Sequence, residues 1–127
     1  MSDLLSSIEI ILKVIVGLSI LNVWLIQPKK ATKWRGGDAK TLIKEFGVYN
    51  LSTTFCYFVG FLKVGLSILL LASIYLDSLT LIGSLGLAGL LLGSIVMHVK
   101  VKDELLKSFP ALLFLVISLV IAYLSTL

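Results

Sequence analysis

The sequence predicts an all-α fold, a transmembrane four-helix bundle with a short amphipathic interfacial helix in its first cytoplasmic loop. Three observations indicate it: four long apolar runs, confinement of the loop lysines and arginines to two segments, and a composition of 58% hydrophobic against 14% charged residues. Soluble domains are closer to half apolar and a quarter charged. A mean hydropathy of +1.09 predicts that the chain is embedded in a lipid bilayer, which is its main partner. The net charge of +4 should then lie on one face of the membrane, the cytoplasmic face, and no nucleic-acid partner is expected.

The four apolar runs are each close to the roughly 20 residues that a hydrocarbon core requires. Only Asp77 and Ser78 separate the second run from the third, so these two should form an antiparallel helical hairpin. Pro110 suits the first turn of the fourth helix. The sequence therefore predicts a single transmembrane domain, residues 1–127, with spans at about 8–26, 54–76, 79–97 and 109–127.

Basic residues set the expected orientation. Asp3 and Glu9 precede or open the first run with no early lysine or arginine, so no cleavable signal peptide is predicted. The loop cations fall in two groups, both of which should face the cytoplasm. Both termini should then lie outside it. The groups are Lys29, Lys30, Lys33, Arg35, Lys40 and Lys44, and Lys100, Lys102 and Lys107.

The first of these loops contains the predicted interfacial helix. Asp38 is a candidate N-cap for a helix that ends before Gly47. The apolar face of this helix would lie in the lipid headgroup region; the alternative is a solvated connector. The apolar face comprises Leu42, Ile43, Phe46 and Tyr49, and the water-facing side comprises Lys40, Lys44 and Glu45.

Small residues predict where helices contact one another, because helix association in lipid depends on close backbone approach. We expect bundle contacts at these positions, with homodimerisation as the alternative. They are Gly83, Gly86, Gly89 and Gly93 on the third span, and Ala111, Ser118, Ala122 and Ser125 on the fourth.

Lys63 is the main candidate for a functional residue, since it lies near the middle of the second span, too deep to reach water. Cys56, Gly60 and Ser67 share its helical face, and Gly60 leaves room beside it for another group or a ligand headgroup. Asn22, Ser94 and His98 could approach it from the other spans, and an acidic partner in the same half of the membrane would have to come from a loop. The candidate ligand-binding residues are Lys63, His98, Ser94, Asn22 and Ser67.

Other polar residues have local explanations. Glu9 and Lys13 are four residues apart, in the favourable order for an ion pair along one helix. A single histidine, His98, predicts a hydrogen-bonded boundary residue and no metal site. The lone Cys56 excludes an intrachain disulfide and a CxxC motif, and it should be a packing residue. No catalytic residue set is recognised.

Two segments carry a resemblance to a known family. Residues 34–49, beginning Trp34-Arg35-Gly36-Gly37-Asp38, and residues 97–112, with His98, Asp103 and Pro110, are similar to signatures of the DoxX-like small membrane proteins. The segment 60–65 resembles the family's second span. The resemblance implies a four-helix membrane bundle, in a bacterial or archaeal cytoplasmic membrane. Its signature residues here are Arg35, Gly36, Gly37, Asp103 and Pro110.

Family members are linked to thiosulfate:quinone oxidoreduction, to oxidative-stress complexes and to receptor assembly, so activity does not follow from the resemblance. The first hypothesis is a binding or assembly component without catalysis of its own, holding a membrane-protein partner or a lipid-like small molecule, with a homo-oligomer as another arrangement. The alternative is a quinone-linked oxidoreductase subunit in which Lys63 and His98 meet a quinone headgroup. No covalent cofactor is expected, and a transporter is disfavoured because no internal repeat is visible.

Overall fold

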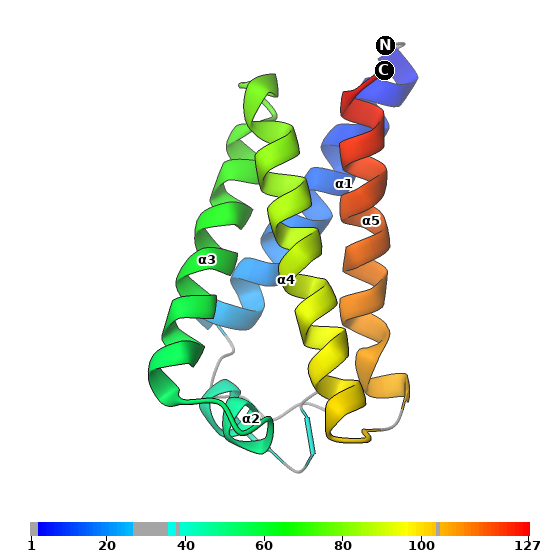
Figure 1. Ribbon diagram of the computed structural model, residues 1–127. Helices are drawn as coiled ribbons and strands as arrows, with labels where there is room; N and C mark the ends of the chain where they lie inside the picture. Colours follow the sequence, from blue (N-terminus) through cyan, green and yellow to red (C-terminus); the bar gives the residue numbers. More distant parts are fainter. Residues whose placement is uncertain (1–2, 27–35, 38, 104) are drawn as a thin grey trace.

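The computed structural model describes residues 3–26, 36–37, 39–103 and 105–127 of the chain. Within these residues the fold is all-α (Figure 1), and four helical segments are long and apolar enough to cross a membrane. The predicted fold class is therefore confirmed. The long helices are α1 (Asp3–Leu21), continued by the π-helical turn η1 (Asn22–Ile26), α3 (Thr53–Ala72), α4 (Thr80–Lys100) and α5 (Phe109–Ser125), and α2 (Leu42–Val48) is short.

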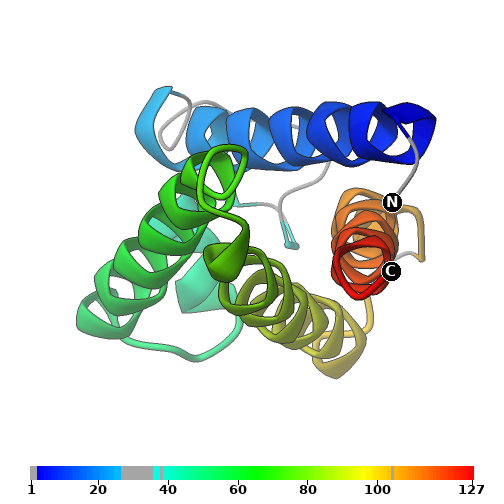
Figure 2. The same cartoon turned by 90° about the horizontal axis from the view of Figure 1, so that it is seen from above.

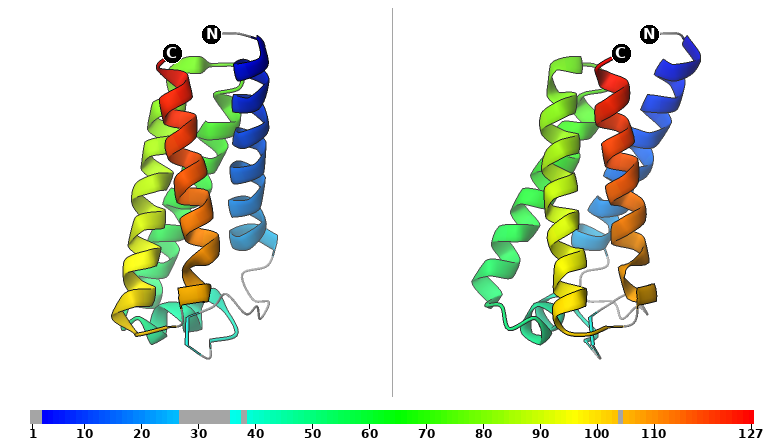
Figure 3. Two further views of the ribbon diagram at one scale, coloured as in Figure 1. Left: turned by 90° about the vertical axis from the view of Figure 1, so that its right-hand side faces the viewer. Right: turned by 45° about the vertical axis from the view of Figure 1, so that its right-hand side comes forward.

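The four long helices form a closed ring around a common core. Helix α1 contacts α3 and α5, and α4 contacts the same two helices from the opposite side (Figure 2). Both chain termini lie at one end of the bundle and α2 lies across the other (Figure 3). We call these the termini end and the loop end. The core cluster consists of Val16, Ile20, Leu70, Leu87, Leu91 and Ile121.

The helix boundaries differ from the predicted spans by a few residues at their ends. Helix α3 ends at Ala72 instead of residue 76, and a 3-10 turn, η2 (Asp77–Leu79), precedes α4. The hydroxyl of Ser73 donates to the Leu70 carbonyl, which satisfies a polar group at the end of the helix. At the loop end, α4 continues to Lys100, because its last turn holds basic side chains that favour a helix C-terminus. The 3-10 turn η3 (Leu105–Ser108) leads into α5, whose first turn contains Pro110 as predicted.

The interfacial helix exists, but it begins and packs differently from the prediction. Its N-cap is Thr41, whose hydroxyl accepts the Lys44 amide at 3.1 Å, and Asp38 lies outside the described residues. Phe46 and Tyr49, expected in the headgroups, are instead buried against the bundle. Phe46 packs with Cys56 and Trp24, so contact with protein replaces contact with lipid. Ile43 remains exposed.

The glycines of α4 divide into two pairs. A Cβ at Gly83 would lie 3.1 Å from the Leu70 backbone, and one at Gly86 would lie 2.8 Å from the Leu66 side chain, so both allow α3 to approach closely. A Cβ at Gly89 or Gly93 would meet nothing within 4 Å. The prediction that all four glycines mark bundle contacts is wrong for this second pair, because α3 and α4 are close only near the termini end. On α5, Ser118 and Ala122 are buried as expected.

Candidate functional site

Lys63 lies on the buried face of α3 with Cys56, Gly60 and Ser67. It is 8% exposed, and its Nζ donates to the Ser94 hydroxyl of α4 at 3.0 Å. An ammonium carries three donors. Among the described residues, no carboxylate oxygen lies within ion-pair distance of this Nζ. Lys63 therefore has a neutral hydrogen-bond partner but no ion-pair partner within 4.0 Å among the described residues, and the Glu45 carboxylate, which lines the same cavity, is farther away.

The indole of Trp24 covers one side of Lys63, with Nζ 5.6 Å from a ring centroid, within the range of a cation–π contact. Gly60 makes this position possible. A Cβ at residue 60 would lie 2.7 Å from the indole, so a side chain larger than hydrogen would displace Trp24. The room that the sequence predicted beside Lys63 is occupied by this ring.

Lys63 and Ser94 line a partly open cavity of about 770 Å³ in the loop half of the bundle. All four long helices and α2 contribute to its wall. Apolar side chains form most of the lining, including Val23, Phe46, Val59, Leu91 and Phe114. The polar lining groups lie at two levels, with Lys63 and Ser94 within the helices and His98, Tyr49, Glu45 and Lys107 at the loop end.

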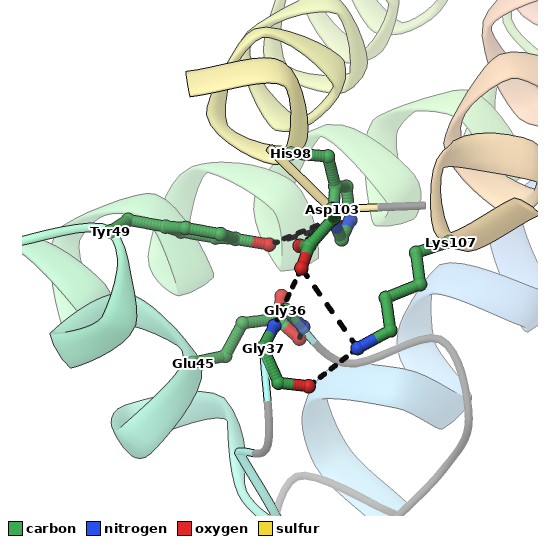
Figure 4. A network of polar contacts seen from close by, with 7 residues as sticks. All are labelled: Gly36, Gly37, Glu45, Tyr49, His98, Asp103 and Lys107. Atoms are coloured by element: carbon green, nitrogen blue, oxygen red, sulfur yellow. Dashed lines mark hydrogen bonds and ion pairs between the residues drawn. The ribbon is translucent and has the colours of Figure 1, made fainter. Parts of the chain in front are cut away.

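The loop-end groups form a network centred on Asp103 (Figure 4). The Asp103 Oδ2 atom lies 2.8 Å from Nδ1 of His98, which donates to it, and Oδ1 accepts the Gly37 amide at 3.0 Å. Lys107 lies 3.9 Å from the same carboxylate and donates to the Gly37 carbonyl. The network thereby joins Gly37 of the first loop to the turn between α4 and α5.

Three further contacts tie α2 and the residue after it, Tyr49, into this network. The Glu45 carboxylate accepts the Gly36 amide at 2.9 Å, and the Tyr49 hydroxyl lies 3.4 Å from the ring nitrogens of His98. Lys100 donates to the Tyr49 carbonyl at 3.3 Å. Gly36 is required here, because a Cβ would lie 2.6 Å from the Tyr49 ring. These contacts explain why Glu45 is not the fully solvated residue that the amphipathic pattern predicted.

The electrostatics of the network favour a charged Asp103. Burial by itself would raise the pKa of this carboxyl, but hydrogen bonds from His98 and the Gly37 amide and the charge of Lys107 outweigh it. The pKa is therefore below the ordinary value of 3.8. A carboxylate that accepts several hydrogen bonds is stabilised in this way.

A separate polar cluster surrounds Lys13 toward the termini end. Its Nζ lies 3.1 Å from the Glu9 carboxylate, as the spacing predicted. It also donates to the Thr80 hydroxyl at 3.0 Å and to the Ser73 carbonyl at 3.2 Å. Lys13 is 2% exposed, so the bundle encloses its side chain. Its three contacts account for the three donors of the ammonium.

The structure brings most of the predicted site residues together. Lys63, Ser94, Asn22 and His98 all line the cavity. Ser67 does not, because its hydroxyl donates to the Lys63 carbonyl at 2.7 Å on the same helix. Of the family-signature residues, Gly36, Gly37 and Asp103 belong to the loop-end network, Pro110 lines the cavity, and Arg35 lies outside the described residues.

Sequence reasoning missed Trp24, Tyr49 and Glu45 as lining residues. The amphipathic pattern of the loop assigned Tyr49 to lipid, and Trp24 was one of several aromatic residues near a predicted boundary. The Lys63–Gly60 spacing was the available signal for Trp24, since a glycine beside a buried cation leaves space for a ring. Within the described residues, no group of three metal-ligating side chains is placed to hold a metal ion.

A comparison with known protein families places this chain among membrane proteins of one described type. The sequence profile described as the DoxX-like family matches residues 33–121, more than half of the chain. This range includes α2, α3, α4 and most of α5. No curated protein and no protein of solved structure matches the chain.

Proposed function

This chain belongs to the DoxX-like family of membrane proteins, and from that premise we propose that it is a binding protein that holds a lipid-like small molecule inside its helical bundle. The observation that carries the proposal is the cavity of about 770 Å³ around Lys63. Small-molecule sites of about 300–1,000 Å³ are typically apolar with a few placed polar groups. The cavity fits that description.

The lining favours a molecule with both apolar and polar parts. Leu91 and Phe114 offer an apolar wall, while Lys63 and Ser94 offer donors at one level inside it. A buried ammonium in a membrane span is costly unless a polar group meets it. A ligand group with acceptor oxygens would supply that contact. Binding of a lipid-like molecule thus accounts for the cavity and for the lysine together.

Native mass spectrometry of the gently extracted protein tests this proposal. We expect a discrete added mass on the intact chain, reduced in Lys63→Met and unchanged in Lys44→Met. Lys44 is an exposed lysine of α2 that does not line the cavity, so it controls for the loss of one positive charge. If neither the parent nor the two variants carry added mass while all three remain folded, the proposal fails. A membrane-protein partner that binds the outer faces of the bundle then becomes the better hypothesis.

A quinone is a second candidate ligand, favoured because Lys63 and His98 line the same cavity. Their donors could meet the carbonyl oxygens of a quinone headgroup and handle its protons. In that case the redox chemistry would come from the quinone and from a partner protein. Lys63→Met should then weaken binding of a short-chain benzoquinone, and equal binding by parent and variant would exclude this candidate.

We also infer that the loop end faces the cytoplasm. The argument is the concentration of lysine and arginine in the two loops at that end. A reporter fused at Leu127 should then be found outside the cytoplasm. A cytoplasmic reporter would reverse the orientation and leave the cavity proposal intact.

A further inference from the structure

Helices α3 and α4 separate toward the loop end (Figure 1), and residues of both helices line the cavity there. Near the termini end, Gly83 and Gly86 pack against Leu70 and Leu66 of α3. Farther along the same helix, Gly89 and Gly93 line the cavity, are exposed, and have open space where a Cβ would be. The wall of the cavity is therefore interrupted at these two glycines.

This opening lies at membrane depth. Gly89 and Gly93 belong to the apolar segment Asp77–Lys100, which is long enough to cross a membrane. On the same helix Leu92 and Val96 are exposed apolar residues, as expected for side chains that face acyl chains. A molecule that passes the opening would thus go from the cavity into the hydrocarbon region of the bilayer.

Lys63 lies at the inner side of this opening. Its side chain crosses from α3 to α4, where its Nζ meets the hydroxyl of Ser94, the neighbour of Gly93. The lysine is more than nine-tenths buried and lines the cavity. Because no described carboxylate pairs with Nζ, an anionic group in the cavity would give this ammonium its counter-ion.

We infer that the bound molecule is an anionic amphiphile whose acidic head pairs with Lys63 and whose hydrocarbon chain leaves the bundle between α3 and α4, past Gly89 and Gly93. This inference rests on the proposed binding function and adds to it the charge of the ligand and the path of its chain. The shared chemistry is a carboxylate or phosphate on a long alkyl chain.

Fluorescence of Trp24 tests whether the head group of the bound molecule is anionic. The chain has two tryptophans, so Trp34→Phe leaves Trp24, which lines the cavity, as the single indole reporter. In dodecyl maltoside micelles we would titrate this protein with dibromostearate and with dibromostearyl alcohol, which quench indole on contact and differ in the charged head. We expect half-maximal quenching at about tenfold lower concentration of the carboxylate, since a close charge pair gives this much or more. Lys63→Met should remove the difference.

Glycine substitutions test the path of the chain. A Cβ at Gly89 or Gly93 has nothing within 4 Å, so Gly89→Leu and Gly93→Leu each start a side chain in open space at the opening. Each should weaken dibromostearate quenching about tenfold. Gly65→Leu is the matched control. Gly65 lies on α3, also has nothing within 4 Å of an added Cβ, and does not line the cavity, so its quenching should equal that of the parent.

The other possible results each refute one part of the inference: the path of the hydrocarbon chain, the charge of the head group, or binding itself. Parent-like quenching in Gly89→Leu and Gly93→Leu, with loss in Lys63→Met, would show that the chain takes another path. Saturable quenching by the alcohol and the carboxylate at equal concentration would refute the anionic head and keep the binding function. No saturable quenching by either probe would refute both. If the glycine variants change only the oligomeric mass measured by light scattering, a second copy of the chain occupies the opening.

Discussion

Two buried lysines show how differently the two halves of this bundle treat the same side chain. Lys13, toward the termini end, has a carboxylate, a hydroxyl and a carbonyl around its ammonium. Lys63, in the loop half, has one hydroxyl and an indole face, and it borders a cavity. Burial alone therefore does not mark a functional lysine. The difference lies in how many of its donors the protein itself satisfies.

The largest effect should come from Lys13→Met, which leaves the buried Glu9 carboxylate without its cation. Removing one partner of a buried ion pair costs about 3–5 kcal/mol. We expect that loss in the free energy of unfolding, measured by SDS titration in mixed micelles with circular dichroism. Lys63→Met is the matched control and should change it by under about 1 kcal/mol, because it strands no charge. Equal losses of unfolding free energy in the two variants would show that the two lysines do not differ in the way proposed.

The next effect concerns the loop-end network, which resembles the Lys13 cluster in being satisfied internally. Asp103→Asn keeps the shape of the side chain but removes the charge that His98 and Lys107 face. Hydrogen bonds to charged groups contribute about 1.5–3 kcal/mol. We expect a loss of about 2 kcal/mol and faster hydrogen exchange at residues 36–49, while exchange in α1 near Lys13 stays unchanged. Uniform acceleration in both regions would argue against a local role.

Substitutions of the hydroxyl partners test the same difference between the two lysines. Thr80→Val should cost about 1–2 kcal/mol, because it withdraws a hydrogen bond from a fully enclosed ammonium. Ser94→Ala should cost less, about 0.5 kcal/mol, since Lys63 borders open space. Both are read from SDS unfolding curves. A larger loss in Ser94→Ala would mean that Lys63 depends on its protein partner as strongly as Lys13 does.

The smallest effect should appear on acidification. The pKa of Asp103 is below its ordinary value of 3.8 in the folded protein. Its contribution to stability is therefore complete above the unfolded value and is lost as the pH falls through the lower folded value. Protease sensitivity of the segment 36–52 should thus rise below about pH 4, by more in the parent than in Asp103→Asn. A parallel rise in the two proteins would assign it to other carboxylates, such as Glu45.

The fold was predictable from sequence because apolar runs and loop charges respond to the bilayer over whole segments. The Glu9–Lys13 pair was predictable too, since both residues lie on one helix. The rest of the Lys13 cluster was not. Thr80 and Ser73 approach Lys13 from more than 50 residues away, and only the packing of the whole bundle brings the end of α3 and the start of α4 next to it.

The candidate site was predictable only in part, for the same reason. Lys63 was identified from its depth, and Ser94 and His98 from their level in the predicted topology. The two glycine pairs of α4 look alike in sequence, yet one packs and the other faces open space, because the angle between α3 and α4 depends on all the residues along both helices. The role of Tyr49 depended on whether the loop folds onto the bundle, which its amphipathic pattern does not determine.

The π-helical turn Asn22–Ile26 at the end of α1 has an evolutionary consequence. Such a turn contains one residue more than the α-helical turn it replaces, and one residue rotates a helix by about 100°. Deletion of a single codon there would restore an α-helix and turn Trp24 away from Gly60 and Lys63. Relatives that lack this codon should tolerate larger residues at the position of Gly60. The aromatic wall of the cavity is thus gained or lost by one insertion or deletion, without any substitution in α3.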